Sequence, residues 1–142
     1  MQTAPVEFEN AIKANTKLIY VETPCNPTLA LTDLKSIAFI GKKHGLLTVV
    51  DNTFASPFNQ RPLEFGIDIV VYSATKYLAG HSDVVAGAVC GSRAHVERLW
   101  PTHVMLGGCL HPNEAWLLCR GIKTFALRMR QINTNGLAVA RW

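Results

Sequence analysis

Two kinds of apolar pattern alternate along the chain and predict alternating strands and helices. Near-continuous apolar runs, four to eight residues long, are typical of buried strands. They occupy Lys17–Glu22, Leu46–Val50, Ile67–Val71 and Val84–Cys90. The run Leu46–Val50 lacks polar alternation, which predicts a strand buried on both faces, as in a parallel sheet.

Helical spacing, with apolar residues every three or four positions, marks the segments between and after these runs. The predicted helices are Val6–Ala14, Thr32–His44, Ala94–Trp100 and a long helix from Pro112, which Asn135–Gly136 kinks or ends. Thr32 or Asp33 can cap the second helix, and Gly45 can close it. In the long helix, Trp116, Phe125 and Met129 are predicted core residues. Residues 1–5 form a short polar lead, and residues 52–62 an irregular loop.

This order of elements predicts an α/β fold with a largely parallel sheet flanked by helices. The 142 residues suffice for at most one domain with a real core. Two prolines fix the turn Thr23–Thr28, and either X–Pro bond could be cis. The chain has no internal repeat, low-complexity tract or linker.

Composition narrows the possible functions. Hydrophobic residues make up 49% and charged residues 17%, which is typical of a globular chain. The net charge is +4, and the basic residues are scattered along the chain and form no stripe that would bind nucleic acid. No apolar run reaches membrane-spanning length. We expect no signal peptide before the first strand. The four cysteines lack metal-ligand spacing, so we expect no metal site. We expect the cysteines to be reduced thiols in a cytoplasmic protein.

Lys76 is the first candidate for chemistry. It follows a predicted buried strand, where an amine is costly unless it is neutral, paired or covalently used. The hydroxyls of Ser73 and Thr75 could hold a phosphate while Lys76 forms a Schiff base, as a pyridoxal 5′-phosphate (PLP) site requires. The alternative is a lysine that extends to solvent between ordinary turn residues.

Asp51 and Asn26 are the second and third candidates. Asp51 ends a predicted strand, and the carboxyl ends of parallel strands form the ligand crevice of open α/β sheets. Its carboxylate could pair with the pyridine nitrogen of PLP, or it could instead bind loop amides. The Asn26 amide could donate to the phenolic oxygen of the ring, or Asn26 could be an ordinary turn residue beside proline.

Three motifs resemble those of the Cys/Met-metabolism PLP enzymes, which include the cystathionine lyases and synthase and methionine γ-lyase. They are Ser-Ala-Thr-Lys-Tyr-Leu-Ala-Gly-His-Ser-Asp-Val-Val (73–85), Val-Asp-Asn-Thr-Phe (50–54) and Glu-Thr-Pro-Cys-Asn-Pro-Thr (22–28). A fourth, Leu-x-Arg-Gly-x-Lys-Thr (118–124), is interpreted as scaffold or interface. The resemblance implies an aspartate aminotransferase-like (fold type I) large domain. It assigns the catalytic lysine to Lys76 and cofactor binding to Lys76, Asp51, Ser73, Thr75 and Asn26.

The resemblance also implies a sulfur amino-acid substrate, β/γ-elimination or γ-replacement, and a homo-oligomer. Residues 1–142 match the later part of the PLP-binding domain. We therefore expect the glycine-rich phosphate turn, the stacking tyrosine and the small domain to lie outside them. Glu22 is expected to give indirect support at most, and His81 to be a structural hydrogen-bonding residue. The alternative function is an inactive remnant that serves as a PLP-binding or interaction module. No dinucleotide, P-loop or serine-hydrolase motif is present.

Overall fold

A computed structural model describes residues 4–142; residues 1–3 of the predicted polar lead lie outside the described part. The described chain divides into two compact units. The first unit holds residues up to Tyr72 together with Ala88–Cys109, and the second holds Ser73–Gly87 together with Leu110–Trp142. The elements are α1 (Pro5–Asn10), β1 (Leu18–Glu22), α2 (Leu34–His44), β2 (Leu47–Asp51), α3 (Ser56–Asn59), the 3₁₀ turn η1 (Pro62–Phe65), β3 (Ile69–Ser73), β4 (Gly87–Gly91), α4 (Arg93–Leu106), α5 (Pro112–Ile122) and α6 (Phe125–Arg141).

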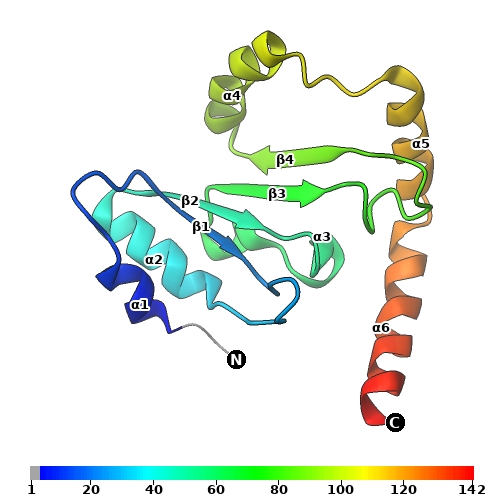
Figure 1. The fold of residues 1–142 in the computed structure, drawn as a ribbon, viewed down its shortest axis with the longest axis horizontal. Coiled ribbons are helices and arrows are strands. Elements are labelled where there is room, and N and C mark those ends of the chain that lie inside the picture. The colour runs from blue at the N-terminus through cyan, green and yellow to red at the C-terminus, as the bar shows by residue number, and fades with distance from the viewer. Residues whose placement is uncertain (1–3) are drawn as a thin grey trace. The chain divides into compact units, whose positions relative to one another are not determined.

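The first unit contains a four-stranded sheet with the strand order β1-β2-β3-β4 (Figure 1). β1 and β3 both pair with β2 in parallel, with Val21 opposite Val50 and Val50 opposite Val70. The figure shows β4 running against β3 at the sheet edge. The predicted mostly parallel α/β arrangement is therefore confirmed, with one antiparallel edge strand.

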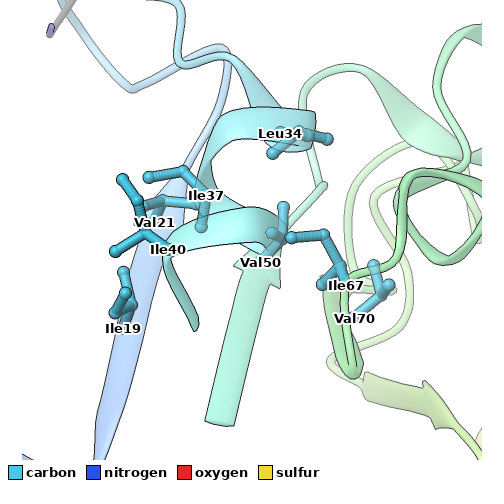
Figure 2. Close-up of a cluster of buried hydrophobic side chains, with 8 residues drawn as sticks. All are labelled: Ile19, Val21, Leu34, Ile37, Ile40, Val50, Ile67 and Val70. Carbon is cyan, nitrogen blue, oxygen red and sulfur yellow. The ribbon is translucent and has the colours of Figure 1, made fainter. Parts of the chain in front are cut away.

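Helix α2 supplies one wall of the core of the first unit. Its cap is Asp33, whose Oδ1 accepts hydrogen bonds from the backbone N–H groups of Lys35 and Ser36. Gly45 ends it in the left-handed conformation at φ 64°. Figure 2 shows side chains of α2 gathered with those of β1, β2 and β3. The cluster consists of Ile19, Val21, Leu34, Ile37, Ile40, Val50, Ile67 and Val70. Both predicted end signals of this helix are confirmed.

All four predicted strands are present, but two of them begin later in the sequence than predicted. β3 begins at Ile69 and β4 at Gly87, each some residues after the apolar run begins. Ile67 belongs instead to the buried core cluster. The central strand β2 has Thr48, Val49 and Val50 buried, as the near-continuous apolar run predicted.

Several predicted helix ends are wrong. α1 stops at Asn10, α3 lies inside the predicted loop of residues 52–62, and η1 begins at its last residue, Pro62. α4 continues past Pro101, at which the prediction stopped, and ends at Gly107 in the left-handed conformation. A proline inside a helix removes one backbone hydrogen bond, but here the remaining turns tolerate that loss.

The long helix predicted from Pro112 is two helices in the second unit. α5 ends at Ile122 and α6 begins at Phe125, while Gly136 lies inside α6 and does not end it. Of the predicted core residues, Met129 is 1% exposed but Trp116 is 62% exposed. Periodicity identifies a helix face, but it does not say whether another element covers that face. Phe125 lies between these extremes, half-buried.

Among residues 4–142, no helix combines the length and apolar character needed to cross a membrane. All four cysteines are free thiols, and three of them are exposed.

Candidate active site

Asp51 lies at the carboxyl end of β2, at the position the sequence predicted. In the sheet register it is opposite Glu22 of β1 and Val71 of β3. Its Oδ1 accepts a hydrogen bond from the backbone N–H of Thr53 at 2.9 Å, and the residue is half-buried. The carboxylate is therefore held at the strand end by the loop that follows it.

Asn26 lies in a constrained turn after β1. Both X–Pro bonds of this turn, Thr23–Pro24 and Asn26–Pro27, are cis. Cys25 closes the turn, because its N–H donates to Ala30 O at 3.0 Å and its carbonyl accepts from the Leu29 N–H at 2.6 Å. The Cys25 thiol lies 3.7 Å from Glu22 Oε2, so the Glu22 carboxylate contacts this turn. Asn26 itself is exposed.

A buried amide network, which the sequence analysis missed, connects the strand ends of the first unit. Asn52 is 0% exposed, and its Nδ2 donates to Gln60 O at 2.8 Å and to the Tyr72 hydroxyl at 3.2 Å. Gln60 Nε2 donates to Asn52 Oδ1 at 2.8 Å and to Thr23 O at 3.1 Å. The network therefore links the turn that carries Asn26, the residue after Asp51 and the end of β3. The only sequence signal is an amide beside Asp51.

Burial raises the pKa of the Tyr72 hydroxyl, although the hydrogen bond from Asn52 acts in the opposite direction. Tyr72 therefore stays a neutral phenol at physiological pH. It is the last residue of the first unit before Ser73.

Lys76 belongs to a tight turn in the second unit, directly after β3. The Lys76 N–H donates to Ser73 O at 3.1 Å, the Ala79 N–H to Ala74 O at 2.9 Å and the Gly80 N–H to Lys76 O at 2.8 Å. The Lys76 side chain is exposed and lines a cavity of about 890 Å³ within this unit. The expectation of a lysine at a buried strand end is therefore wrong, because β3 stops at Ser73 and the turn carries Lys76 outward.

Thr75, the second predicted phosphate ligand, has a partner in the structure. Its hydroxyl donates to Ala86 O at 3.2 Å and accepts from the Ala86 N–H at 2.9 Å. The backbone N–H of Thr75 also donates to Ala86 O, at 3.1 Å. The hydroxyl proton can therefore turn toward an anion without leaving the Ala86 carbonyl unsatisfied. Ser73 is half-buried and is the last residue of β3.

His81 has the structural role that the sequence predicted. Its Nδ1 lies 2.8 Å from the carbonyl oxygen of Ala79. Because a carbonyl oxygen only accepts, Nδ1 must carry the proton in this contact. The imidazole thus supports the turn after Lys76.

Comparison with known proteins gives the family of this chain. The model of the Cys/Met metabolism PLP-dependent enzymes matches residues 2–142. The chain belongs to this family. It is 53% identical to the cystathionine γ-lyase of Bacillus subtilis over 135 residues, covering 94% of this chain and 36% of that protein. It is 47% identical to the L-methionine γ-lyase of Porphyromonas gingivalis over 141 residues, covering 97% and 35%.

Solved structures agree with this assignment. The crystal structure of cystathionine γ-lyase from Lactobacillus plantarum complexed with L-serine aligns with a TM-score of 0.84 and 49% identity, covering 86% of this chain and 32% of that chain. The predicted family, fold class and cofactor are therefore confirmed. The chain spans about a third of the length of these relatives.

The side chains present fit the cofactor of the family. PLP offers an aldehyde, a phenolic oxygen, a ring nitrogen and a phosphate. The chain has an exposed amine at Lys76, an amide at Asn26, a carboxylate at Asp51 and hydroxyls at Ser73 and Thr75. This set contains one suitable group for each polar feature of the cofactor.

Proposed function

We propose that this chain is part of a PLP-dependent enzyme that acts on sulfur-containing amino acids by β/γ-elimination or γ-replacement. The observation that carries the proposal is the exposed amine of Lys76 in the turn directly after β3, the strand that pairs with the one ending in Asp51. The relatives named cystathionine γ-lyase, cystathionine β-lyase and methionine γ-lyase support the choice of sulfur amino acids.

Each candidate residue has a role in this proposal. Lys76 binds the cofactor covalently, and Asp51 pairs with the ring nitrogen. The hydroxyls of Ser73 and Thr75 bind the phosphate, and the Asn26 amide donates to the phenolic oxygen. Residues 1–142 then form the later part of the cofactor-binding large domain, in a homo-oligomeric cytoplasmic enzyme whose remaining site residues lie outside them.

Lys76 also moves the proton on which the chemistry depends. When bound, the cofactor supplies an electron sink for the negative charge that develops at the substrate α-carbon. Once the substrate amine had displaced Lys76 from the cofactor, the freed Lys76 Nζ would take the α-proton and return it at a later step, as a general base and acid. The Asp51 carboxylate keeps the ring nitrogen protonated. The hydrogen bond from the Thr53 N–H fixes the orientation of this carboxylate. The turn bonds at Ser73 and Gly80 fix the backbone of Lys76.

A chimera tests this function. Residues of this chain replace the matched segment of the Bacillus subtilis cystathionine γ-lyase, and release of α-keto acid from cystathionine, homocysteine and methionine is measured. We expect turnover by the chimera, none by its Lys76→Ala variant, and none by residues 1–142 alone. Circular dichroism establishes that each protein is folded.

Two outcomes contradict the proposal. One is a folded chimera that is inert toward all three amino acids. The other is turnover that survives Lys76→Ala. A chimera that binds PLP but has no activity would favour the alternative function, an inactive remnant that serves as a PLP-binding module.

A further inference from the structure

Arg128 of α6 makes a set of hydrogen bonds to the turn that follows Lys76. Its Nη1 donates to Tyr77 O at 2.8 Å, and its Nη2 donates to Leu78 O at 3.4 Å and to Gly121 O at 3.0 Å. Its Nε donates to Thr124 Oγ1 at 3.1 Å. Four of the five N–H groups of a guanidinium are therefore used inside the second unit.

These bonds complete the backbone of the Lys76 turn. Like the last turn of a helix, this turn leaves carbonyl groups without a partner along the chain. Lys76 O accepts from the Gly80 N–H, and Ala79 O lies 2.8 Å from His81 Nδ1. The two carbonyls between them, of Tyr77 and Leu78, are the ones that Arg128 binds. Arginine near a helix end satisfies carbonyls in the same way.

Two glycines allow this close approach. A Cβ on Gly80, at φ 77°, would collide with the guanidinium of Arg128. A Cβ on Gly121 would collide with the backbone of Ala79. The turn therefore contacts the α5–α6 corner directly, with its backbone against Gly121 and its carbonyls on Arg128.

The bonding of Arg128 excludes the alternative of a substrate-binding arginine. An arginine that binds a substrate carboxylate presents a pair of parallel N–H groups to it. Here both terminal nitrogens donate to backbone carbonyls of the chain. Among the described residues, none of the ion pairs includes Arg128. Its partners are carbonyl dipoles of the turn.

We propose that Arg128 is a positioning residue for Lys76, because its guanidinium fixes the turn from which the Lys76 side chain extends. This inference rests on the proposed function of Lys76. Arg128 and Lys76 line the same cavity, so a displaced turn would change where the amine lies in it. A lysine at position 128 cannot reproduce the planar set of donors and should restore the turn only in part.

The test uses the whole chain, excess PLP and borohydride reduction, followed by peptide mass mapping of each lysine. The variants are Arg128→Met and Arg128→Lys, with Arg130→Met as the matched control, because Arg130 is exposed on the same helix. Labelling of Lys42 and Lys43, which lie in the first unit, is the internal reference. Hydrogen exchange of peptide 76–81 reports the turn itself.

We expect Arg128→Met to slow labelling of Lys76 by roughly tenfold to a hundredfold, since small displacements of a reacting group cost this much. Arg128→Lys should fall between Arg128→Met and the unchanged chain, and Arg130→Met should equal the unchanged chain. Labelling of Lys42 and Lys43 should not change. Exchange of peptide 76–81 should become faster in Arg128→Met.

One result would overturn this inference, and a different result would overturn the proposed function of Lys76. Unchanged Lys76 labelling in a folded Arg128→Met or Arg128→Lys variant overturns it, and Arg128→Lys carries the test if Arg128→Met does not fold. A chain whose Lys76 is never labelled, even without substitution, overturns the proposed function instead. The two failures are therefore distinguishable.

Discussion

Asn52 and Gln60 bind each other in both directions. The Asn52 side chain donates to the Gln60 carbonyl, and the Gln60 side chain donates to the Asn52 amide oxygen, each at 2.8 Å. Since Gln60 also donates to Thr23 O, this pair connects the segments after β1 and β2. The pair therefore joins the residue immediately after Asp51 to Thr23, three residues before Asn26.

Asn52→Ala is expected to lower the free energy of unfolding by about 1–3 kcal/mol. The substitution removes the Asn52 amide from the half-buried Gln60 carbonyl and from the Gln60 side chain, which keeps only its bond to Thr23 O. An unsatisfied polar group away from water costs this much. Urea denaturation measures the loss, and Asn10→Ala, at an exposed asparagine, is the control. A free energy of unfolding within about 0.5 kcal/mol of the unchanged chain would mean that the network contributes little.

Gly121→Ala and Gly136→Ala should have opposite effects on stability. A Cβ on Gly121 meets the Ala79 backbone, whereas a Cβ on Gly136, inside α6, meets nothing within 4 Å. We expect a loss of about 1–3 kcal/mol for Gly121→Ala, as for other overpacked sites. For Gly136→Ala we expect a gain of about 0.5–1 kcal/mol, because alanine is the better helix former. Thermal denaturation of both variants decides this, and equal effects would refute the close contact at Gly121.

The cap of α2 should make stability depend on pH. The hydroxyl of Ser36 and then the backbone N–H groups of Ser36 and Lys35 lower the pKa of Asp33 below its ordinary value of 3.8. A carboxyl whose pKa is lower in the folded state stabilises at neutral pH, and this contribution disappears as the pH falls through that lowered pKa. Asp33→Ala should therefore cost about 1 kcal/mol at neutral pH and less in acid.

Asp33→Asn is the matched control for this pH dependence. Asparagine caps a helix nearly as well as aspartate but does not titrate. Its free energy of unfolding should therefore lack the acid-dependent part that Asp33 contributes. If the unchanged chain and Asp33→Asn lose stability in parallel between neutral pH and about pH 3, the lowered pKa of Asp33 has no thermodynamic weight.

The sequence predicted best the parts of the molecule that local patterns encode. The apolar run Leu46–Val50 indicated the buried strand β2, and Asp33 and Gly45 indicated the ends of α2, because capping chemistry is local. The motif residues were predicted through family resemblance as well as from strand ends. The break between α5 and α6 was missed, because the apolar spacing continues through Lys123 and Thr124.

Contacts between distant residues could not be predicted from these patterns. Arg128 reaches Tyr77 across 51 positions, and Gln60 reaches Thr23 across 37. Neither pair has a spacing that marks a contact. The exposure of Lys76 was missed for a related reason, since an apolar run does not say how many residues separate the strand end from the next side chain.

Asp51→Asn in the chimera should separate cofactor binding from chemistry. The amide keeps a similar shape but loses the negative charge that keeps the ring nitrogen protonated. We expect PLP labelling of Lys76 to remain while exchange of the substrate α-proton slows by about two orders of magnitude, a barrier increase on the order of 3 kcal/mol. Deuterium exchange followed by mass spectrometry measures this. Exchange at the unchanged rate would show that Asp51 has another role.

The most direct test of the central claim is to map the lysine that PLP modifies. The chain is incubated with excess PLP, reduced with borohydride, digested and analysed by mass spectrometry, with Lys76→Arg as the control. The proposed function predicts label on Lys76 ahead of every other lysine, even where binding by residues 1–142 alone is weak, and loss of that label in Lys76→Arg. Label on Lys42, Lys43 or Lys123 with Lys76 unmodified would contradict it.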